Sequence, residues 1–315
     1  MEKNAKIYVA GHRGLAGSAL CRALDAAGYK NILTRSSTTV DLRDPVAATA
    51  LFESERPEYV FLAAAKVGGI HANSTYPADF IHDNLAIELN VIHQAWRHGV
   101  KRLLFLGSSC VYPRECPQPI REEYLLTGPL EKTNDAYAIA KIAGIKMCEA
   151  YHRQHGAGFF CAMPTNLYGP GDNYNLENSH VLPALIRKFH EGKRDGKLSV
   201  EVWGTGSPRR EFLFSDDMAS ACLFLMNQPD DIIFGSGNTL VNVGCGTDLT
   251  IKELAGLIAK VIGYTGELAW NHSKPDGTPV KRLDVRRLSK MGWKPKIPLE
   301  DGIRIAYENF LKGQE

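Results

Sequence analysis

The chain of 315 residues is 44% hydrophobic and 23% charged with a formal net charge of +2, a composition that excludes a general electrostatic attraction to nucleic acid or to membrane surfaces. No apolar run approaches the roughly 18 residues that a membrane span needs, and residues 1–6 lack the apolar core of a signal peptide. The seven cysteines include no CxxC pair, so we expect reduced thiols, no metal site and a cytoplasmic location.

Short apolar runs alternate with amphipathic stretches over the first half of the chain. Strands are predicted at residues 6–10, 31–34, 59–63, 102–106 and 159–163, and helices at 15–28, 46–55, 79–98 and 135–155. This alternation predicts an α/β fold with a doubly wound parallel sheet of the Rossmann type and right-handed crossovers.

The alternation weakens after about residue 165. Helices are predicted at residues 181–191, 215–227, 250–263 and 299–311, and a strand at 198–203. We expect residues 1–165 to form the core of a dinucleotide-binding domain. Residues 166–315 should form mainly a smaller substrate-binding lobe over the end of the sheet, with some segments returning to the first domain.

Three glycines lie between the first predicted strand and the first predicted helix. Glycine permits a tight turn and lets backbone N–H groups approach a pyrophosphate at the helix N-terminus. The GxxGxxG spacing resembles that of short-chain dehydrogenases. The predicted cofactor loop comprises Gly11, His12, Arg13, Gly14, Leu15, Ala16 and Gly17.

The end of the second predicted strand indicates which dinucleotide is bound. An NAD-specific site usually has a carboxylate there for the ribose 2′-hydroxyl, whereas this chain has Arg35. Arg35 and Arg13 could instead pair with a 2′-phosphate, although both could also be solvated loop residues. Asp41 and Leu42 suit the adenine pocket. The expected cofactor is therefore NADP(H).

Tyr137 and Lys141 are four residues apart on a predicted helix, so both side chains can face one cleft. A neighbouring ammonium is expected to lower the pKa of the phenol, and Ser108 at the end of the fourth strand can donate to a substrate carbonyl. Together they resemble the catalytic triad of short-chain dehydrogenases. Two strand ends are expected to contact the cofactor, at Leu106, Gly107, Ser108 and Ser109 and at Pro164, Thr165, Asn166 and Leu167.

Longer blocks resemble the GDP-L-fucose synthase family of extended short-chain dehydrogenases/reductases, in the same order from about residue 5 to residue 310. They are residues 63–70 (AAAKVGGI), 106–113 (LGSSCVYP), 137–144 (YAIAKIAG), 163–170 (MPTNLYGP), 178–183 (NSHVLP), 210–213 (REFL) and 274–279 (KPDGTP).

The resemblance implies epimerisation of GDP-4-keto-6-deoxy-D-mannose at the two carbons flanking the ketone, then NADPH reduction to GDP-L-fucose. It implies Cys110 as the base and His180 as the acid, with His180 also beside the cofactor. Substrate contacts are implied for Lys188, Trp203, Arg210 and Asp276. Many relatives have arginine in place of Lys188. The family also implies a homodimer formed through the helix near residues 79–98 and the helix bearing Tyr137.

Other interpretations of the same residues remain open. Cys110 could be a small buried residue and His180 a packed helix-start residue. The same triad also serves NAD-dependent nucleotide-sugar 4-epimerases and 4,6-dehydratases, but Arg35 disfavours NAD, and Ser109-Cys110 replaces the acidic pair of dehydratases. A non-catalytic dinucleotide sensor is a further alternative, although such proteins commonly lose the tyrosine or lysine that this chain retains.

Overall fold

The computed structural model describes residues 1–235, 237–274 and 276–313. Its centre is a six-stranded sheet in the order β10-β5-β4-β3-β1-β2, and every neighbouring pair is parallel. This confirms the predicted Rossmann-type sheet. The strands are β1 (Ile7–Ala10), β2 (Ile32–Leu33), β3 (Tyr59–Leu62), β4 (Arg102–Leu106), β5 (Gly158–Pro164) and β10 (Leu240–Val243).

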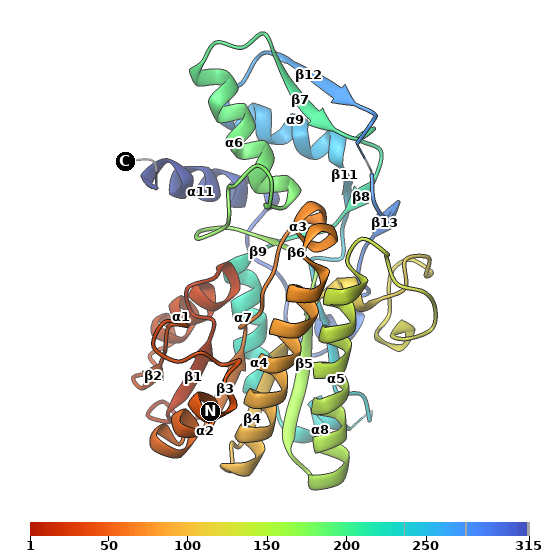
Figure 1. Ribbon diagram of the computed structural model, residues 1–315. Coiled ribbons are helices and arrows are strands. Elements are labelled where there is room, and N and C mark those ends of the chain that lie inside the picture. Colours follow the sequence, from red (N-terminus) through yellow and green to blue (C-terminus); the bar gives the residue numbers. More distant parts are fainter. Residues whose placement is uncertain (236, 275, 314–315) are drawn as a thin grey trace.

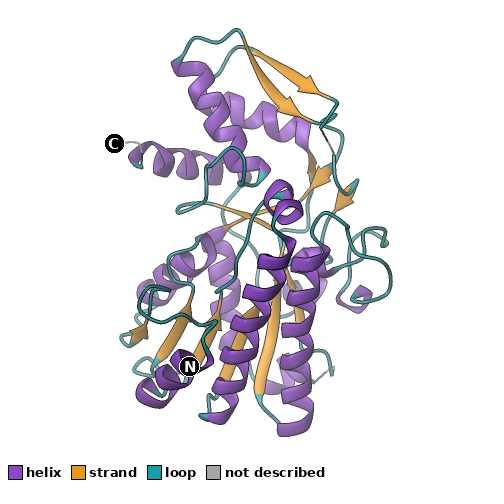
Figure 2. Cartoon of the chain, in the orientation of Figure 1, coloured by secondary structure: helices purple, strands orange, loops and turns teal. Residues whose placement is uncertain are grey.

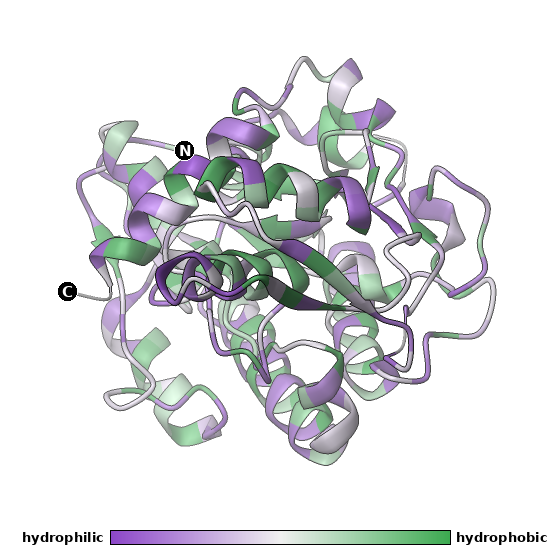
Figure 3. Ribbon diagram, turned by 90° about the horizontal axis from the view of Figure 1, so that it is seen from above, coloured by the Kyte–Doolittle hydropathy of each residue, from purple (hydrophilic) through white to green (hydrophobic). Residues whose placement is uncertain are grey.

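Helices cover both faces of this sheet (Figure 1). Alternate side chains of β1 point to opposite faces, Ile7 and Val9 toward one core and Tyr8 and Ala10 toward the other. The first core is completed by α1 (Leu15–Ala26) and α7 (Ser215–Met226), and the second by α2 (Pro45–Glu55), α4 (Pro77–Arg97) and α5 (Asp135–His155). Viewed from above, hydrophobic segments gather toward the middle of the molecule and hydrophilic ones along the outer loops (Figure 3).

A second group of elements lies over the carboxyl ends of the strands (Figure 2). Its core is formed by buried apolar residues of three helices and of strands β6, β7 and β9, including Leu182, Phe189, Val202, Leu254 and Phe310. The elements are α6 (Val181–Arg194), β7 (Ser199–Trp203), α9 (Ile251–Ile262), β12 (Glu267–Asn271) and α11 (Leu299–Lys312), with the short strands β6 (Asn166–Tyr168), β8 (Arg209–Arg210), β9 (Phe212–Phe214), β11 (Leu249–Thr250) and β13 (Val280–Lys281).

Several short elements were not predicted from the sequence. They are α3 (Ile70–Thr75), the 3₁₀ turns η1 (Ser109–Val111) and η2 (Glu122–Tyr124), α8 (Asp230–Phe234), α10 (Arg286–Lys290) and the strands β6 and β8–β13. The most consequential of these is β10, because it closes the edge of the large sheet beside β5. Its buried Asn242 interrupts the apolar pattern and accepts a hydrogen bond from the Tyr112 hydroxyl at 2.6 Å.

Within residues 1–235, 237–274 and 276–313, no helix combines the length and apolar character of a membrane span. The same part of the chain contains no cluster of three or more His, Cys, Asp or Glu side chains arranged to hold a metal ion. The cysteines are free thiols.

Candidate active site

A cleft of about 330 Å³ is lined by residues from the carboxyl ends of the sheet strands and from the second group of elements. It collects residues that are far apart in the sequence, from the loop after β3 to β13. The predicted site residues among its lining are Ser108, Cys110, Tyr137, Asn166, Leu167, His180, Lys188, Trp203, Arg210 and Asp276. Pro275, within the block of residues 274–279, lies outside the described residues.

The glycine loop between β1 and α1 is too tightly packed to accept side chains at two of its glycines. A Cβ on Gly17 would lie 2.1 Å from the carbonyl oxygen of Gly11, and one on Gly11, whose φ is +85°, would lie 2.8 Å from the backbone of Ala64. Gly14 precedes α1, and the first-turn N–H groups of that helix point out of its N-terminus. The loop therefore fits the role of a pyrophosphate cradle.

The two arginines near this loop differ in how freely they could bind an anionic ligand. Arg13 is exposed, and Arg35 forms an ion pair with Glu55. Burial of the imidazole and, to a smaller degree, the Arg13 charge lower the pKa of His12. A 2′-phosphate at this position would compete with Glu55 for the Arg35 guanidinium.

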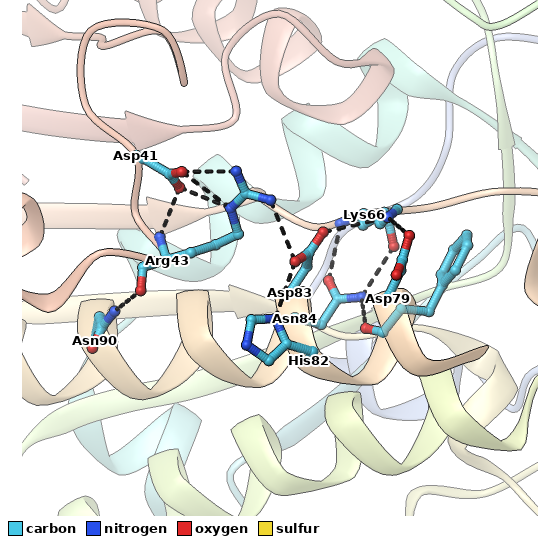
Figure 4. A network of polar contacts seen from close by, with 9 residues as sticks. Asp41, Arg43, Lys66, Asp79, His82, Asp83, Asn84 and Asn90 are labelled. Atoms are coloured by element: carbon cyan, nitrogen blue, oxygen red, sulfur yellow. Dashed lines mark hydrogen bonds and ion pairs between the residues drawn. The ribbon is translucent and has the colours of Figure 1, made fainter. Parts of the chain in front are cut away.

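A polar network fixes the loops after β2 and β3 against α4 (Figure 4). Arg43 donates to both carboxylate oxygens of Asp41, with the Nη2–Oδ2 pair at 2.7 Å, and its Nη1 lies 3.3 Å from Asp83. Lys66 pairs with Asp79 and Asp83 at 2.9 and 3.4 Å. The predicted adenine-side residues therefore differ: Asp41 remains at the surface, whereas the Leu42 side chain is buried in the core.

Tyr137 lies in the first turn of α5, packed edge-on against Phe80 of α4 with ring centroids 6.3 Å apart. Burial is the main cause of a strong rise in its pKa, and the nearby Cys110 and Glu88 charges add to it, while the Ser108 hydroxyl acts in the opposite direction. Tyr137 is therefore a phenol at neutral pH, poised to donate a proton.

Lys141 is one helical turn below Tyr137, as predicted, but its ammonium points elsewhere. Its Nζ lies 3.2 Å from Oε1 of Glu88, donates to the Leu106 carbonyl at 3.2 Å, and is 6.0 Å from the Tyr137 ring centroid. The expectation that Lys141 lowers the pKa of Tyr137 was therefore wrong: burial raises this pKa, and the Lys141 ammonium pairs with the buried Glu88 carboxylate.

The Cys110 thiol faces two donors. Lys281 Nζ and Asn134 Nδ2 each lie 3.3 Å from its sulfur, and the Cys110 backbone N–H donates to Ser108 Oγ at 3.3 Å. Burial opposes ionisation of the thiol, but Lys281, Ser108 and Arg210 outweigh it, so the pKa of Cys110 is lowered. A lowered pKa increases the thiolate fraction, as a carbon-acid base requires.

His180 immediately precedes α6 and is exposed to the cleft. The cleft walls and the positive charge of Lys281 lower the pKa of its imidazole. Cys110 and His180 thus share Lys281 as a neighbouring cation, which favours thiolate on one and neutral imidazole on the other.

The predicted substrate residues make different local contacts. Lys188 Nζ donates to the Glu201 carbonyl at 3.0 Å and lies 5.0 Å from the centre of the Trp203 ring, with Lys274 on that ring at 4.8 Å. The Arg210 guanidinium donates to the Asp276 carbonyl at 3.3 Å. Asp276 itself accepts from Thr205 N and Oγ1, both at 2.8 Å, so its carboxylate braces the loop of Thr205.

The two strand ends expected beside the cofactor meet at the base of the cleft. Leu106 contributes its carbonyl to Lys141, and a Cβ on Gly107 would collide with Met163 Sδ at 2.3 Å. Thr165 and Asn166 both donate to the Glu211 carbonyl, at 3.1 and 2.7 Å. Ser109, Pro164 and Leu167 belong to the same strand ends, in η1, β5 and β6 respectively.

The sequence prediction missed three residues that contact its site. Lys281 and Asn134 touch Cys110, and Glu88 pairs with Lys141. No local motif marks Lys281 or Asn134. The signal for Glu88 was a charged residue within the buried stripe of a predicted helix, at a position where it would otherwise be expensive to bury.

Comparison with known proteins identifies the family to which this chain belongs. A protein-family model described as the NAD dependent epimerase/dehydratase family matches residues 7–244. This class agrees with a dinucleotide cradle beside a tyrosine–lysine pair.

Relatives narrow the assignment further. GDP-L-fucose synthase 1 of Arabidopsis thaliana is 56% identical over 99% of this chain and 94% of that protein, and the GDP-L-fucose synthase of Escherichia coli K12 is 51% identical over 98% of each. A solved GDP-mannoheptose C4 reductase from Campylobacter jejuni, with NADP bound, is 41% identical over 99% of each chain, with a TM-score of 0.91. The chain therefore belongs to the NAD dependent epimerase/dehydratase family and, within it, groups with the GDP-L-fucose synthases.

Proposed function

We propose that this enzyme converts GDP-4-keto-6-deoxy-D-mannose into GDP-L-fucose by inverting carbons 3 and 5 of the sugar and then reducing its 4-keto group with NADPH. The observation that carries the proposal is a single cleft lined both by Ser108 and Tyr137 of the reductase set and by the proton-exchange pair Cys110 and His180. Full-length similarity to GDP-L-fucose synthases supports the choice of substrate.

Epimerisation uses the acidity of protons beside a ketone. The Cys110 thiolate removes one such proton, which leaves an enolate whose charge is on the 4-oxygen. The Ser108 and Tyr137 hydroxyls donate hydrogen bonds to that oxygen. His180 in its imidazolium form then donates a proton to the same carbon from the opposite face and is left as neutral imidazole, so the centre is inverted with no net oxidation.

Reduction uses the same oxygen-binding groups. Bound NADPH would provide the hydride for carbon 4. The Tyr137 phenol donates its proton to the 4-oxygen while Ser108 holds that oxygen. The burial that raises the pKa of Tyr137 keeps this proton in place until charge develops on the substrate. Lys141, whose ammonium donates to the Leu106 carbonyl at the end of β4, would hold a ribose hydroxyl of the cofactor.

The cofactor seat is formed by the Gly11–Gly17 loop and the ends of β4 and β5. The space denied to side chains at Gly11 and Gly17 supports this assignment, as does a 41% identical structure with NADP bound. Arg13 and Arg35 are the proposed partners of the 2′-phosphate. For the GDP moiety we propose Arg210 and Lys188 at the phosphates and Trp203 as an apolar face, with Asp276 shaping the pocket.

Deuterium exchange tests the two stages separately. The enzyme is incubated with GDP-4-keto-6-deoxy-D-mannose in heavy water, first without NADPH and then with it, and the sugar is read by mass and NMR. We expect deuterium at carbons 3 and 5 without NADPH and GDP-L-fucose after its addition. Reduction without exchange would instead indicate a simple C4 reductase. The absence of both exchange and NADPH oxidation would exclude the proposed substrate, and turnover with NAD alone would favour a 4-epimerase or dehydratase.

Two variants assign the proton-exchange roles. Cys110→Ser and His180→Asn should each lower exchange by roughly 10²–10⁴-fold. Cys116→Ser is the matched control, because this half-buried thiol is close in sequence but does not line the cleft. Loss of exchange in the control would show that substitution in this region, and not the Cys110 thiol, was responsible.

We also propose a homodimer, a cytoplasmic location, and a division into a cofactor domain around residues 1–165 and a substrate lobe in residues 166–315. Support for the dimer comes from the outward sides of α4 and α5, where Leu89 and Ile139 are 57% and 47% exposed. Trp96 stacks on His155 of the neighbouring helix, with centroids 4.5 Å apart. An exposed apolar strip along two adjacent long helices is suited to pairing with a second copy.

A further inference from the structure

Glu88 is an unusual residue in the middle of α4, because its carboxylate is buried within the protein interior. The residue is 1% exposed, and Lys141 opposite it is 2% exposed. A buried carboxylate is costly unless it is paired. Neither Glu88 oxygen accepts a hydrogen bond from the residues that the structure describes, and the one cation that faces it is the Lys141 ammonium at 3.2 Å.

The surrounding residues provide a seat for this carboxylate. A Cβ on Gly144, one turn after Lys141 in α5, would lie 2.7 Å from Oε2 of Glu88 and 2.7 Å from the Phe105 ring. The missing side chain of Gly144 therefore makes the space in which the charge is held. This seat adjoins the end of β4, where Lys141 donates to the Leu106 carbonyl.

We propose that Glu88 is a positioning residue of the active site: it holds the Lys141 ammonium against the end of β4 and keeps Tyr137 in the phenol form that protonates the reduced sugar. The inference rests on the proposed function and deepens it. Glu88 touches neither substrate nor cofactor, and acts through Lys141 and through the field of its charge at Tyr137.

The electrostatics agree with this geometry. Burial raises the pKa of Glu88 to about 7, opposed by Lys141 and by the backbone at Gly144. The titratable groups that face it are Lys141 and Tyr137 of α5 and Cys161 of β5. Burial is the main cause of the raised pKa of Tyr137, and the charges of Cys110 and Glu88 add to it, so removing the Glu88 charge should let the phenol ionise at lower pH.

The test compares the pH dependence of kcat for C4 reduction in the wild type, Glu88→Asp and Glu88→Gln. We expect the alkaline limb of the profile to move to lower pH in the order Glu, Asp, Gln, by roughly one unit or more in the glutamine variant. Glu149→Gln is the matched control, since Glu149 is a partly exposed glutamate of α5 paired with Lys146 at 2.7 Å; its profile should be unchanged. Identical profiles in folded Glu88→Gln and wild type would overturn the proposal.

A second readout does not depend on the reaction. With ¹³Cζ-labelled tyrosine, the Tyr137 resonance is assigned by its loss in Tyr137→Phe, and its ionisation is followed by NMR in each protein without substrate or cofactor. An earlier onset of ionisation in Glu88→Gln supports the proposal, and an unchanged onset refutes it, even if the sugar assignment fails. If Glu88→Gln does not fold, Glu88→Asp carries both measurements, with a smaller shift in the same direction; no shift there refutes the proposal.

Discussion

Lys281 is a single positive charge near two groups with opposite proposed roles, a base and an acid, and it favours the deprotonated form of both. Its ammonium is 3.3 Å from the Cys110 sulfur and lowers the pKa of both Cys110 and His180. Lys281→Met should therefore raise both pKa values, which means less thiolate at neutral pH and more imidazolium. We expect alkylation of Cys110 by iodoacetamide, followed by peptide mass, to need higher pH in this variant. Lys146→Met on the surface of α5 is the control, and an unshifted alkylation profile in Lys281→Met would show that the lysine does not set the thiol's charge.

Tyr137 and Tyr151 lie on the same helix, so the same substitution at each distinguishes a catalytic hydroxyl from a structural one. Tyr137→Phe removes the proposed proton donor and should lower kcat for reduction by roughly 10²–10⁴-fold. Tyr151→Phe removes only a hydroxyl that is 2.7 Å from His93 Nδ1, outside the cleft, and should leave kcat within about twofold. NADPH oxidation at saturating substrate measures both. Equal activity of the two variants would remove Tyr137 from its role.

Sequence reasoning works for site residues when a motif places them and fails when only the fold brings them together. Tyr137 and Lys141 were predictable because helical spacing puts them on one face. The direction of the Lys141 ammonium was not predictable, because it depends on Glu88 from another helix. Lys281 reaches Cys110 across 171 positions of sequence, a separation at which no local pattern operates.

At the scale of elements, long amphipathic helices were the most predictable. The bounds of α5 and β4 agree with the prediction residue for residue, since hydrophobic periodicity and flanking polar residues mark their ends. The short strands of the upper lobe, such as β8 and β13 with two residues each, are too short to show any period. Their pairing comes from tertiary contacts.

The turn into α1 gives a prediction at this scale. In Gly17→Ala the new methyl would overlap the Gly11 carbonyl, 2.1 Å away, so we expect a loss of about 1–3 kcal/mol of stability and weaker NADPH binding. Gly256→Ala in α9 is the matched control, because its methyl would meet nothing within 4 Å; it should gain about 0.5–1 kcal/mol. Thermal unfolding and NADPH fluorescence titration measure the two effects. Wild-type affinity in Gly17→Ala would contradict the proposed cradle.

At the scale of the whole molecule, the exposed strip on α4 and α5 predicts the assembly state. Leu89→Glu would bury a charge at the proposed contact between copies and should shift the protein from dimer to monomer at micromolar concentration. Val46→Glu on α2, at a residue 75% exposed and away from that strip, is the control. Native mass spectrometry or sedimentation reports the mass. A wild-type monomer would exclude the dimer, and a dimer that survives Leu89→Glu would place the contact elsewhere.

The position of β10 late in the sequence has a consequence for folding during synthesis. Strand β5 ends at Pro164, but its outer neighbour spans Leu240–Val243. During synthesis the outer edge of β5 therefore remains unpaired while more than seventy further residues are added. An unpaired strand edge can template aggregation. The cofactor-binding half cannot be released early as a finished unit. A chain interrupted before residue 240 should be recovered as insoluble protein, although every residue of the predicted catalytic triad would already be present.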